Sequence, residues 1–164
     1  MEIWKAQRTL LLVGEGHHEE AFLRHVKGLY VPRSCGLSVK IKNARGKGAQ
    51  HVVEWTAKQM TNAAYDACAA LLDTDTDYTA DVINFTYSRR IQLLPSKPCL
   101  EAMLLRLLGE KPHPNRAKLK KQFAPFVGDD PTEHGNYRKH FTRELFESKR
   151  NHESTIHDLI VLLE

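Results

Sequence analysis

The amino-acid sequence predicts an α/β protein with an open, mostly parallel sheet that is flanked by helices. Continuous apolar runs at residues 9–13 and 67–72 are typical of strands that are buried on both faces of a parallel sheet. Segments with the apolar spacing of amphipathic helices lie between such runs, in the alternating order of right-handed βαβ units. Both runs also end in acidic residues, and ligands bind open α/β sheets at the carboxyl ends of the strands.

About four strands are expected, in the spatial order 2-1-3-4 of a Rossmann-like sheet. Their predicted positions are residues 9–13, 37–41, 67–72 and 91–94. A helix is expected after each strand, at residues 18–30, 50–65, 79–88 and 99–108. Ser96 is predicted to be the N-cap of the last of these helices, with Pro98 in its first turn and Gly109 at its end.

The chain divides into an α/β domain at residues 1–109 and a C-terminal helical extension at residues 110–164, which is expected to pack on the same domain. The pattern changes at this boundary, because residues 110–136 are loop-rich and contain four of the seven prolines. Helices are expected again at residues 137–150 and 152–163.

The composition is that of a globular protein, since 41% of the 164 residues are hydrophobic and 27% are charged. The three cysteines are far apart in the sequence, and no pair has zinc-ligand spacing, which favours a reducing compartment and a cytoplasmic location. No apolar stretch approaches the roughly 20 residues that cross a bilayer, so no membrane partner is expected. The net charge of +4 is compatible with nucleic acid as a partner. A protein partner or a homo-oligomer stays open.

Three carboxylates follow two strands that are expected to be neighbours. Glu15 lies between Gly14 and Gly16 after the first strand, and Asp73 and Asp75 follow the third strand. Residues two apart in an extended chain point to the same side, so both aspartates are expected to face Glu15 across the sheet edge. Carboxylates gathered in this way repel one another unless a cation neutralises them. Mg²⁺ (or Mn²⁺) fits best, because it binds one or two carboxylates and bridges to phosphates.

Further residues are candidates for extending this site. Asp77 could be another metal ligand, or the N-cap of the helix that follows. Gly16 would let a substrate approach Glu15 closely, with His17 beside it, and Lys47 lies in a basic loop suited to a phosphate. Basic residues of the extension could also grip phosphates, although such a run is more often a solvated helix face. They are Arg116, Lys118, Lys120, Lys121, Arg138, Lys139, Arg143 and Arg150.

The order of these motifs resembles the Toprim domain, the metal-dependent fold shared by topoisomerases, bacterial primases, the OLD nucleases and small RloB-like proteins. A hydrophobic strand followed by Glu, here LLLVGEG, precedes a strand that ends in Asp-x-Asp, here ALLDTDTD. The segment GEGHHEEAFLRHV is similar to the opening of the nuclease-like members, although His17-His18 replaces their small or hydroxyl residue. The segment SKPCLEAMLL is similar to one in RloB-like proteins, and the likeness extends over about residues 8–108.

This resemblance implies a Mg²⁺-dependent phosphodiesterase that acts on nucleic acid, in defence or DNA repair. Glu15 would be a general acid/base or metal ligand, and Asp73 and Asp75 would bind the metal and serve catalysis. Lys97 and Glu101, in the SKPCLE segment, are expected to contact the substrate.

Two other functions stay open. The domain could bind metal and nucleic acid, or a partner protein, without catalysis. The DTDT motif at residues 73–76 also matches the DxDxT signature of haloacid-dehalogenase-type phosphatases, with Asp73 as nucleophile and the VGDD segment at 127–130 as a later acidic motif. That family carries DxD after its first strand, whereas here the motif follows the third, and Pro125 disfavours a strand before the later motif.

Overall fold

The computed structural model describes residues 7–164, and its centre is a four-stranded sheet in which all neighbouring strands are parallel. The strands are β1 (Arg8–Gly14), β2 (Leu37–Asn43), β3 (Ala67–Asp73) and β4 (Gln92–Ser96). They lie in the order β2-β1-β3-β4, which confirms the α/β class and the strand order predicted from the sequence. β1 and β3 are the two central strands, and their continuous apolar character reflects burial on both faces.

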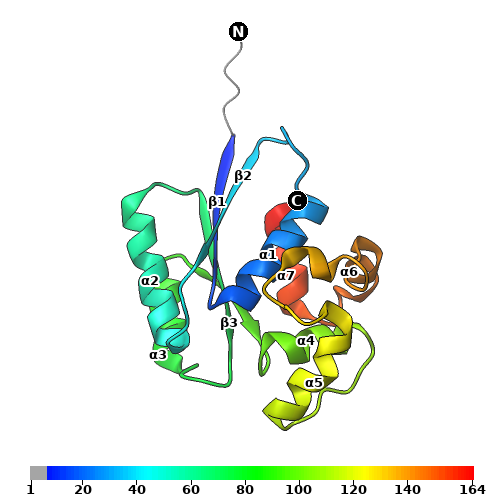
Figure 1. Cartoon of the computed structure of the whole chain (residues 1–164). Helices are drawn as coiled ribbons and strands as arrows, with labels where there is room; N and C mark the ends of the chain where they lie inside the picture. Colours follow the sequence, from blue (N-terminus) through cyan, green and yellow to red (C-terminus); the bar gives the residue numbers. More distant parts are fainter. Residues whose placement is uncertain (1–6) are drawn as a thin grey trace.

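Helices cover both faces of the sheet, and each face has its own hydrophobic core (Figure 1). On one face lie α2 (Gly48–Asn62) and α3 (Ala80–Ser88). On the other lie α1 (His17–Tyr30), α4 (Leu100–Leu107) and α7 (Ser154–Leu163). Successive strand residues enter different cores, as Leu71 packs in the α1 and α4 core and Leu72 in the α2 and α3 core.

The register brings the ends of the strands to one edge of the sheet. Gly14 pairs with Asn43 of β2 and with Leu71 of β3, and Asp73 pairs with Ser96 of β4. The segments that follow the strands therefore start close together, as the sequence predicts for a ligand-binding edge. Among the described residues, no helix is both long and apolar enough to cross a membrane.

The C-terminal segment contributes to the core on the α1 and α4 face. It contains α5 (Arg116–Val127), the 3-10 helix η1 (His134–Tyr137), α6 (Arg143–Lys149) and α7. Tyr137, Phe141 and Phe146 belong to the same buried cluster as Phe22 of α1. The buried ring of His25 stacks on Tyr137, and its Nε2 donates to Phe141 O (2.6 Å). Burial, opposed by this hydrogen bond, lowers the pKa of His25, so the ring is neutral there.

The region predicted to be loop-rich is irregular at residues 110–115 and 128–133, and it contains a regular helix, α5, between these loops. Leu119, Phe123 and Val127 recur every four residues and are all buried in the core. Pro125 lies within the last turn of the helix. Burial of the apolar stripe outweighs the one hydrogen bond that the proline cannot donate.

Two helix starts also differ from the prediction. The single helix expected at 137–150 is interrupted, because Thr142 Oγ1 accepts the N–H of Leu145 (3.2 Å) and caps a new helix, α6. Ser96 is not an N-cap: it is the last residue of β4, and Cys99 caps α4 without a side-chain hydrogen bond. The strand continues to Ser96 because its neighbour β3 extends as far as Asp73.

Candidate metal centre

Glu15 is held at the carboxyl end of β1 by two contacts with the backbone of β3. Its N–H donates to Leu71 O (3.0 Å), and its Oε2 accepts the N–H of Asp73 (2.9 Å). The turn into α1 is tight, since a Cβ added to Gly14 would stand 2.9 Å from the Glu19 Cβ. The absence of a side chain at Gly14 therefore lets the first turn of α1 pack against the end of β1.

Asp73 lies on the face of the sheet that α1 and α4 cover. Ala69 and Leu71, four and two residues earlier on β3, pack in the core on this face, and strand alternation aims Asp73 the same way. The residue is only 9% exposed. Its Oδ1 accepts the N–H of Leu100, the first residue of α4, at 3.0 Å. The positive end of the α4 dipole thus faces this carboxylate.

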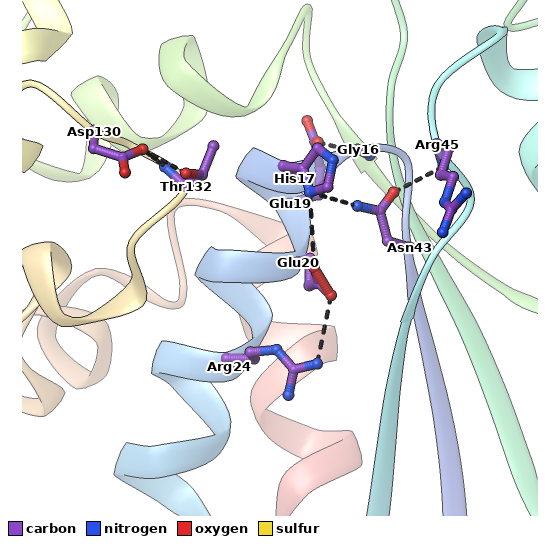
Figure 2. Close-up of polar contacts among 9 residues, drawn as sticks. All are labelled: Gly16, His17, Glu19, Glu20, Arg24, Asn43, Arg45, Asp130 and Thr132. Atoms are coloured by element: carbon purple, nitrogen blue, oxygen red, sulfur yellow. Dashed lines mark hydrogen bonds and ion pairs between the residues drawn. The ribbon is translucent and has the colours of Figure 1, made fainter.

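Glu19 is a third carboxylate at this edge, and the sequence reasoning gave it no role in the site. A glutamate in the first turn of a helix is favoured by the helix dipole, which by itself indicates no part in a site. In the structure Glu19 is 7% exposed, and its Oε2 accepts the N–H of Gly16 at 3.0 Å (Figure 2). No local sequence signal distinguishes Glu19 from its neighbours, because exposed His17 lies in the same helical turn and only the packing of α1 against the end of β1 directs Glu19 to the cluster.

Glu15, Glu19 and Asp73 form the inner cluster, in which one oxygen of each residue lies within 4.8 Å of the others. Burial raises the pKa of Asp73 to about 8, helped by the charges of Glu19, Glu15, Glu101 and Asp75. Burial also raises the pKa of Glu19 to about 7, despite a backbone hydrogen bond that lowers it. Burial raises the pKa of Glu15 as well, although the hydrogen bond from the Asp73 N–H lowers it. All three groups are therefore costly to ionise until a positive charge joins them.

The inner cluster could hold a metal ion, and its donors fit a small, hard divalent cation. All three donors are carboxylate oxygens, which Mg²⁺ and Mn²⁺ prefer to imidazole or thiolate. Glu15 is only half-buried, which leaves the cluster accessible from one side for water and substrate. Of the three expected ligands, the structure brings Glu15 and Asp73 together, and Glu19 joins them in place of Asp75.

Asp75 lies outside the inner cluster. β3 ends at Asp73, so the alternation expected to aim Asp75 at Glu15 stops before reaching it. Asp75 Oδ2 instead forms an ion pair with Arg116 Nη1 of α5 at 3.3 Å. Burial is the main cause of the raised pKa of Glu15, and the charge of Asp75 adds to it, while the hydrogen bond from the Asp73 N–H lowers it.

Asp77 also lies outside the inner cluster and is exposed. It adopts a left-handed φ of 58°, and it packs against the start of α2, where a Cβ added to Gly48 would stand 2.8 Å from Asp77 Oδ2. The alternative role as an N-cap belongs to Thr79, whose Oγ1 accepts the N–H of Val82.

Glu101 lies beside the inner cluster and pairs with His18, with 3.1 Å between Oε1 and Nδ1. The hydrogen bond to Glu101 raises the pKa of His18. Burial acts to raise the pKa of Glu101, but the bond from His18 and its own backbone contacts outweigh burial and lower it. Glu101 is thus charged near neutral pH, and its charge adds to the raised pKa of Glu19 and Asp73.

The other predicted substrate-binding residues lie around the same edge of the sheet. Gly16 is the N-cap of α1, and exposed His17 accepts a hydrogen bond from Asn43 Nδ2 at its Nδ1 (3.0 Å; Figure 2). Lys47 is exposed at the start of α2 in a left-handed conformation, with φ of 72°. Lys97 is exposed in the turn after β4. None of these residues belongs to the inner cluster, but all four could meet a substrate that reaches it.

Two cavities lie beside the acidic edge, and the larger of them is lined by several basic side chains. The larger, of about 470 Å³, opens next to Asp75 between α4 and α5. Its polar lining includes Arg106, Lys111, His113 and Arg116. The smaller, of about 250 Å³, is bounded by His18, Glu101 and Lys120, with Phe123 and Val127 on its apolar side.

The basic residues predicted to grip phosphates divide into two groups. Arg143 stacks over the ring of Tyr30 at 4.7 Å, and Arg150 pairs with Glu147 and Glu164, so both join elements of the fold. The others have exposed side chains: Arg116, Lys118, Lys120, Lys121, Arg138 and Lys139.

Comparison of the chain with protein-family models, with curated proteins and with solved structures gives no match in any of the three.

Proposed function

We propose that the protein is a Mg²⁺- or Mn²⁺-dependent phosphodiesterase of the Toprim type that cleaves nucleic acid. The observation that carries this proposal is the inner cluster, whose three oxygens lie within 4.8 Å at the carboxyl edge of the sheet. Supporting it, Glu15 follows the first strand and Asp73 the third in a parallel sheet of order β2-β1-β3-β4, as in the Toprim pattern.

The three inner carboxylates have distinct roles in this proposal. Asp73 and Glu19, the more deeply buried, would hold the cation, which when bound neutralises phosphate charge and lowers the pKa of water. Glu15 is half-buried, and its raised pKa suits it to accept a proton from the attacking water. Its contact with the Asp73 N–H keeps the two side chains in a fixed relation.

The cavity next to Asp75 supports a phosphate-containing substrate. Lys111 and Arg116 supply positive charge to its lining, although Arg116 also pairs with Asp75, and the third lining cation, Arg106, is paired with Glu153. Lys47 and Lys97 add positive charge at the edge of the sheet, where a strand that passes the inner cluster would meet them. Charged contacts of this kind bind the phosphate backbone without reading its sequence.

The phosphatase alternative has less support. Asp129 and Asp130 follow helix α5 and are exposed, whereas the later acidic motif of that family follows a strand. Asp73 would also have to attack as a nucleophile although its Oδ1 already accepts a hydrogen bond from Leu100 and the residue is buried. A metal- and nucleic-acid-binding module without catalysis differs from the proposed enzyme only in the outcome of a cleavage assay.

The test is cleavage of labelled single- and double-stranded DNA and RNA in the presence of Mg²⁺, Mn²⁺ or EDTA. Wild type is compared with Asp73→Asn, Glu19→Gln and the control Asp158→Asn, a carboxylate of α7 that is not part of the inner cluster. Cleavage that needs the metal and is lost only in the first two variants supports the proposal. Cleavage in EDTA, or cleavage that survives both substitutions, contradicts it. Metal-dependent binding without any cleavage favours the non-catalytic module.

A further inference from the structure

Ser96 carries the one buried side-chain polar atom, within residues 7–164, that has no hydrogen-bond partner. The residue is 0% exposed, and its Oγ has no hydrogen-bond partner among the protein atoms. Its backbone is bonded normally, since Ser96 O accepts the N–H of Thr74 at 3.1 Å. Desolvating a hydroxyl without a compensating hydrogen bond is unfavourable, and such a group calls for a specific reason.

The position of Ser96 supplies that reason. It is the last residue of β4 and is the register partner of Asp73, the last residue of β3. Leu94 and Leu71, two residues earlier on the same strands, both pack in the core under α1 and α4. Strand alternation therefore puts the Ser96 and Asp73 side chains next to each other on that face, on strands that lie about 4.8 Å apart.

Asp73 has an oxygen to spare for such a neighbour. Its Oδ1 accepts the N–H of Leu100 at 3.0 Å, and its backbone N–H donates to Glu15. Carboxylates that bind metals are usually oriented by hydrogen bonds from a surrounding shell of donors. A buried hydroxyl without a partner, side by side with a carboxylate of the inner cluster, has the chemistry and the place of such a donor.

We propose that Ser96 is a positioning residue of the metal centre, whose hydroxyl donates a hydrogen bond to the Asp73 carboxylate when this carboxylate binds a divalent cation. The bond fixes the orientation in which Asp73 presents its oxygen. This inference rests on the proposed function, because it requires a cation at the inner cluster. The desolvation of Ser96 is then compensated in the loaded protein and left uncompensated in the metal-free protein.

The test compares Ser96→Ala with Thr155→Val by Mn²⁺ titration calorimetry and by thermal unfolding of the metal-free protein. Thr155 is the matched control, because it is a buried hydroxyl beside the same strand, but its Oγ1 already donates to Pro95 O at 2.6 Å. Ser96→Ala is expected to weaken Mn²⁺ binding by about 10-fold, with unchanged or higher metal-free stability. Thr155→Val is expected to lower metal-free stability and leave Mn²⁺ affinity unchanged. Ser96→Thr, which keeps the hydroxyl, is expected to recover the affinity lost in Ser96→Ala.

Each other outcome has a definite meaning. If Ser96→Ala binds Mn²⁺ as tightly as wild type, the role of Ser96 is wrong and the proposed metal centre stands. If Ser96→Ala loses affinity only together with metal-free stability, as a merely structural residue would, the positioning role is also wrong. If wild type itself binds no Mn²⁺, both this inference and the proposed function are overturned.

Discussion

The carboxylates that follow β1 and β3 form two sets with different surroundings. The inner cluster of Glu15, Glu19 and Asp73 is packed against the starts of α1 and α4, and burial raises all three pKa values, with a smaller contribution from neighbouring carboxylates. The outer set, Asp75 and Asp77, is exposed, and Asp75 already shares its charge with Arg116. The inner cluster thus has an electrostatic cost that a cation would relieve, whereas the outer set does not. Burial, more than membership of the Asp-x-Asp motif, distinguishes the candidate ligands.

The largest expected difference between the two sets is in metal affinity. Asp73→Asn removes an inner ligand but keeps the oxygen that accepts the Leu100 N–H. We expect it to weaken Mn²⁺ binding by at least about 100-fold, beyond what is typical for residues that only support a ligand. The matched outer variant, Asp77→Asn, should bind Mn²⁺ as wild type does. Calorimetric titration measures both, and equal losses in the two variants would remove the distinction between the sets.

The inner cluster should also make the metal-free protein less stable at high pH. The folded-state pKa values of Asp73 (about 8) and Glu19 (about 7) exceed the ordinary values of 3.8 and 4.5. At a pH between the ordinary and the raised values, the folded chain therefore holds more protons than the unfolded chain. This contribution is fully present below about pH 4 and is lost as the pH rises through 7 and 8. Between about pH 6 and pH 9, the free energy of unfolding should therefore fall by at least about 1 kcal/mol in wild type.

Asp73→Asn is the control for this pH dependence, since it removes one titrating group and leaves histidines such as His25 in place. Urea unfolding of metal-free wild type and variant across this pH range gives the difference directly. Asn at this position should flatten the decline, and saturating Mg²⁺ should do the same in wild type. A wild-type protein that gains stability relative to the variant as the pH rises would contradict the raised pKa values.

Breaking the ion pair between Asp75 and Arg116 should have a smaller effect on Mn²⁺ affinity and on stability. Arg116→Ala leaves Asp75 unpaired at an exposed position, and exposed pairs contribute at most about 1 kcal/mol to stability. We expect a change in the free energy of unfolding below about 0.5 kcal/mol and little change in Mn²⁺ affinity. Nucleic-acid affinity should fall, because Arg116 also lines the cavity next to Asp75. A loss of Mn²⁺ binding as large as in Asp73→Asn would show that Asp75 and Arg116 belong to the metal centre.

The smallest expected effect concerns the basic loop before α2. Lys47→Ala removes one exposed charge at the sheet edge and touches neither set of carboxylates. If Lys47 contacts a phosphate, the slope of log affinity for DNA against log salt should decrease by about 1. Fluorescence anisotropy at several salt concentrations measures this slope. An unchanged slope would mean that the loop is a solvated turn.

The strands and their order could be predicted from the sequence because burial on both faces requires continuous apolar runs, and β1 and β3 are the two runs of this kind. The acidic ends of these strands followed directly, and Glu15 and Asp73 do meet. Glu19 could not be found by the same reasoning, because a first-turn glutamate satisfies the helix dipole wherever the helix points. Only the packing of α1 on the end of β1, which Gly14 permits, turns Glu19 toward the cluster.

Asp75 and Ser96 show where local sequence rules give the wrong environment. Two residues apart in a strand share a face, but β3 ends at Asp73, so the rule does not extend to Asp75. A serine before a proline and a helix is typical of an N-cap, yet pairing with β3 keeps Ser96 in the sheet. In both cases the end of a strand depends on its neighbouring strand, which a single segment of sequence does not contain.

The central claim is that the inner cluster is the metal centre, and a crystal soaked in Mn²⁺ tests it most directly. Anomalous difference density is predicted among the oxygens of Glu15, Glu19 and Asp73, and no comparable density is predicted at Asp75 and Asp77. Density at the outer set alone, or no density at the inner cluster at saturating Mn²⁺ near pH 8, would contradict the claim.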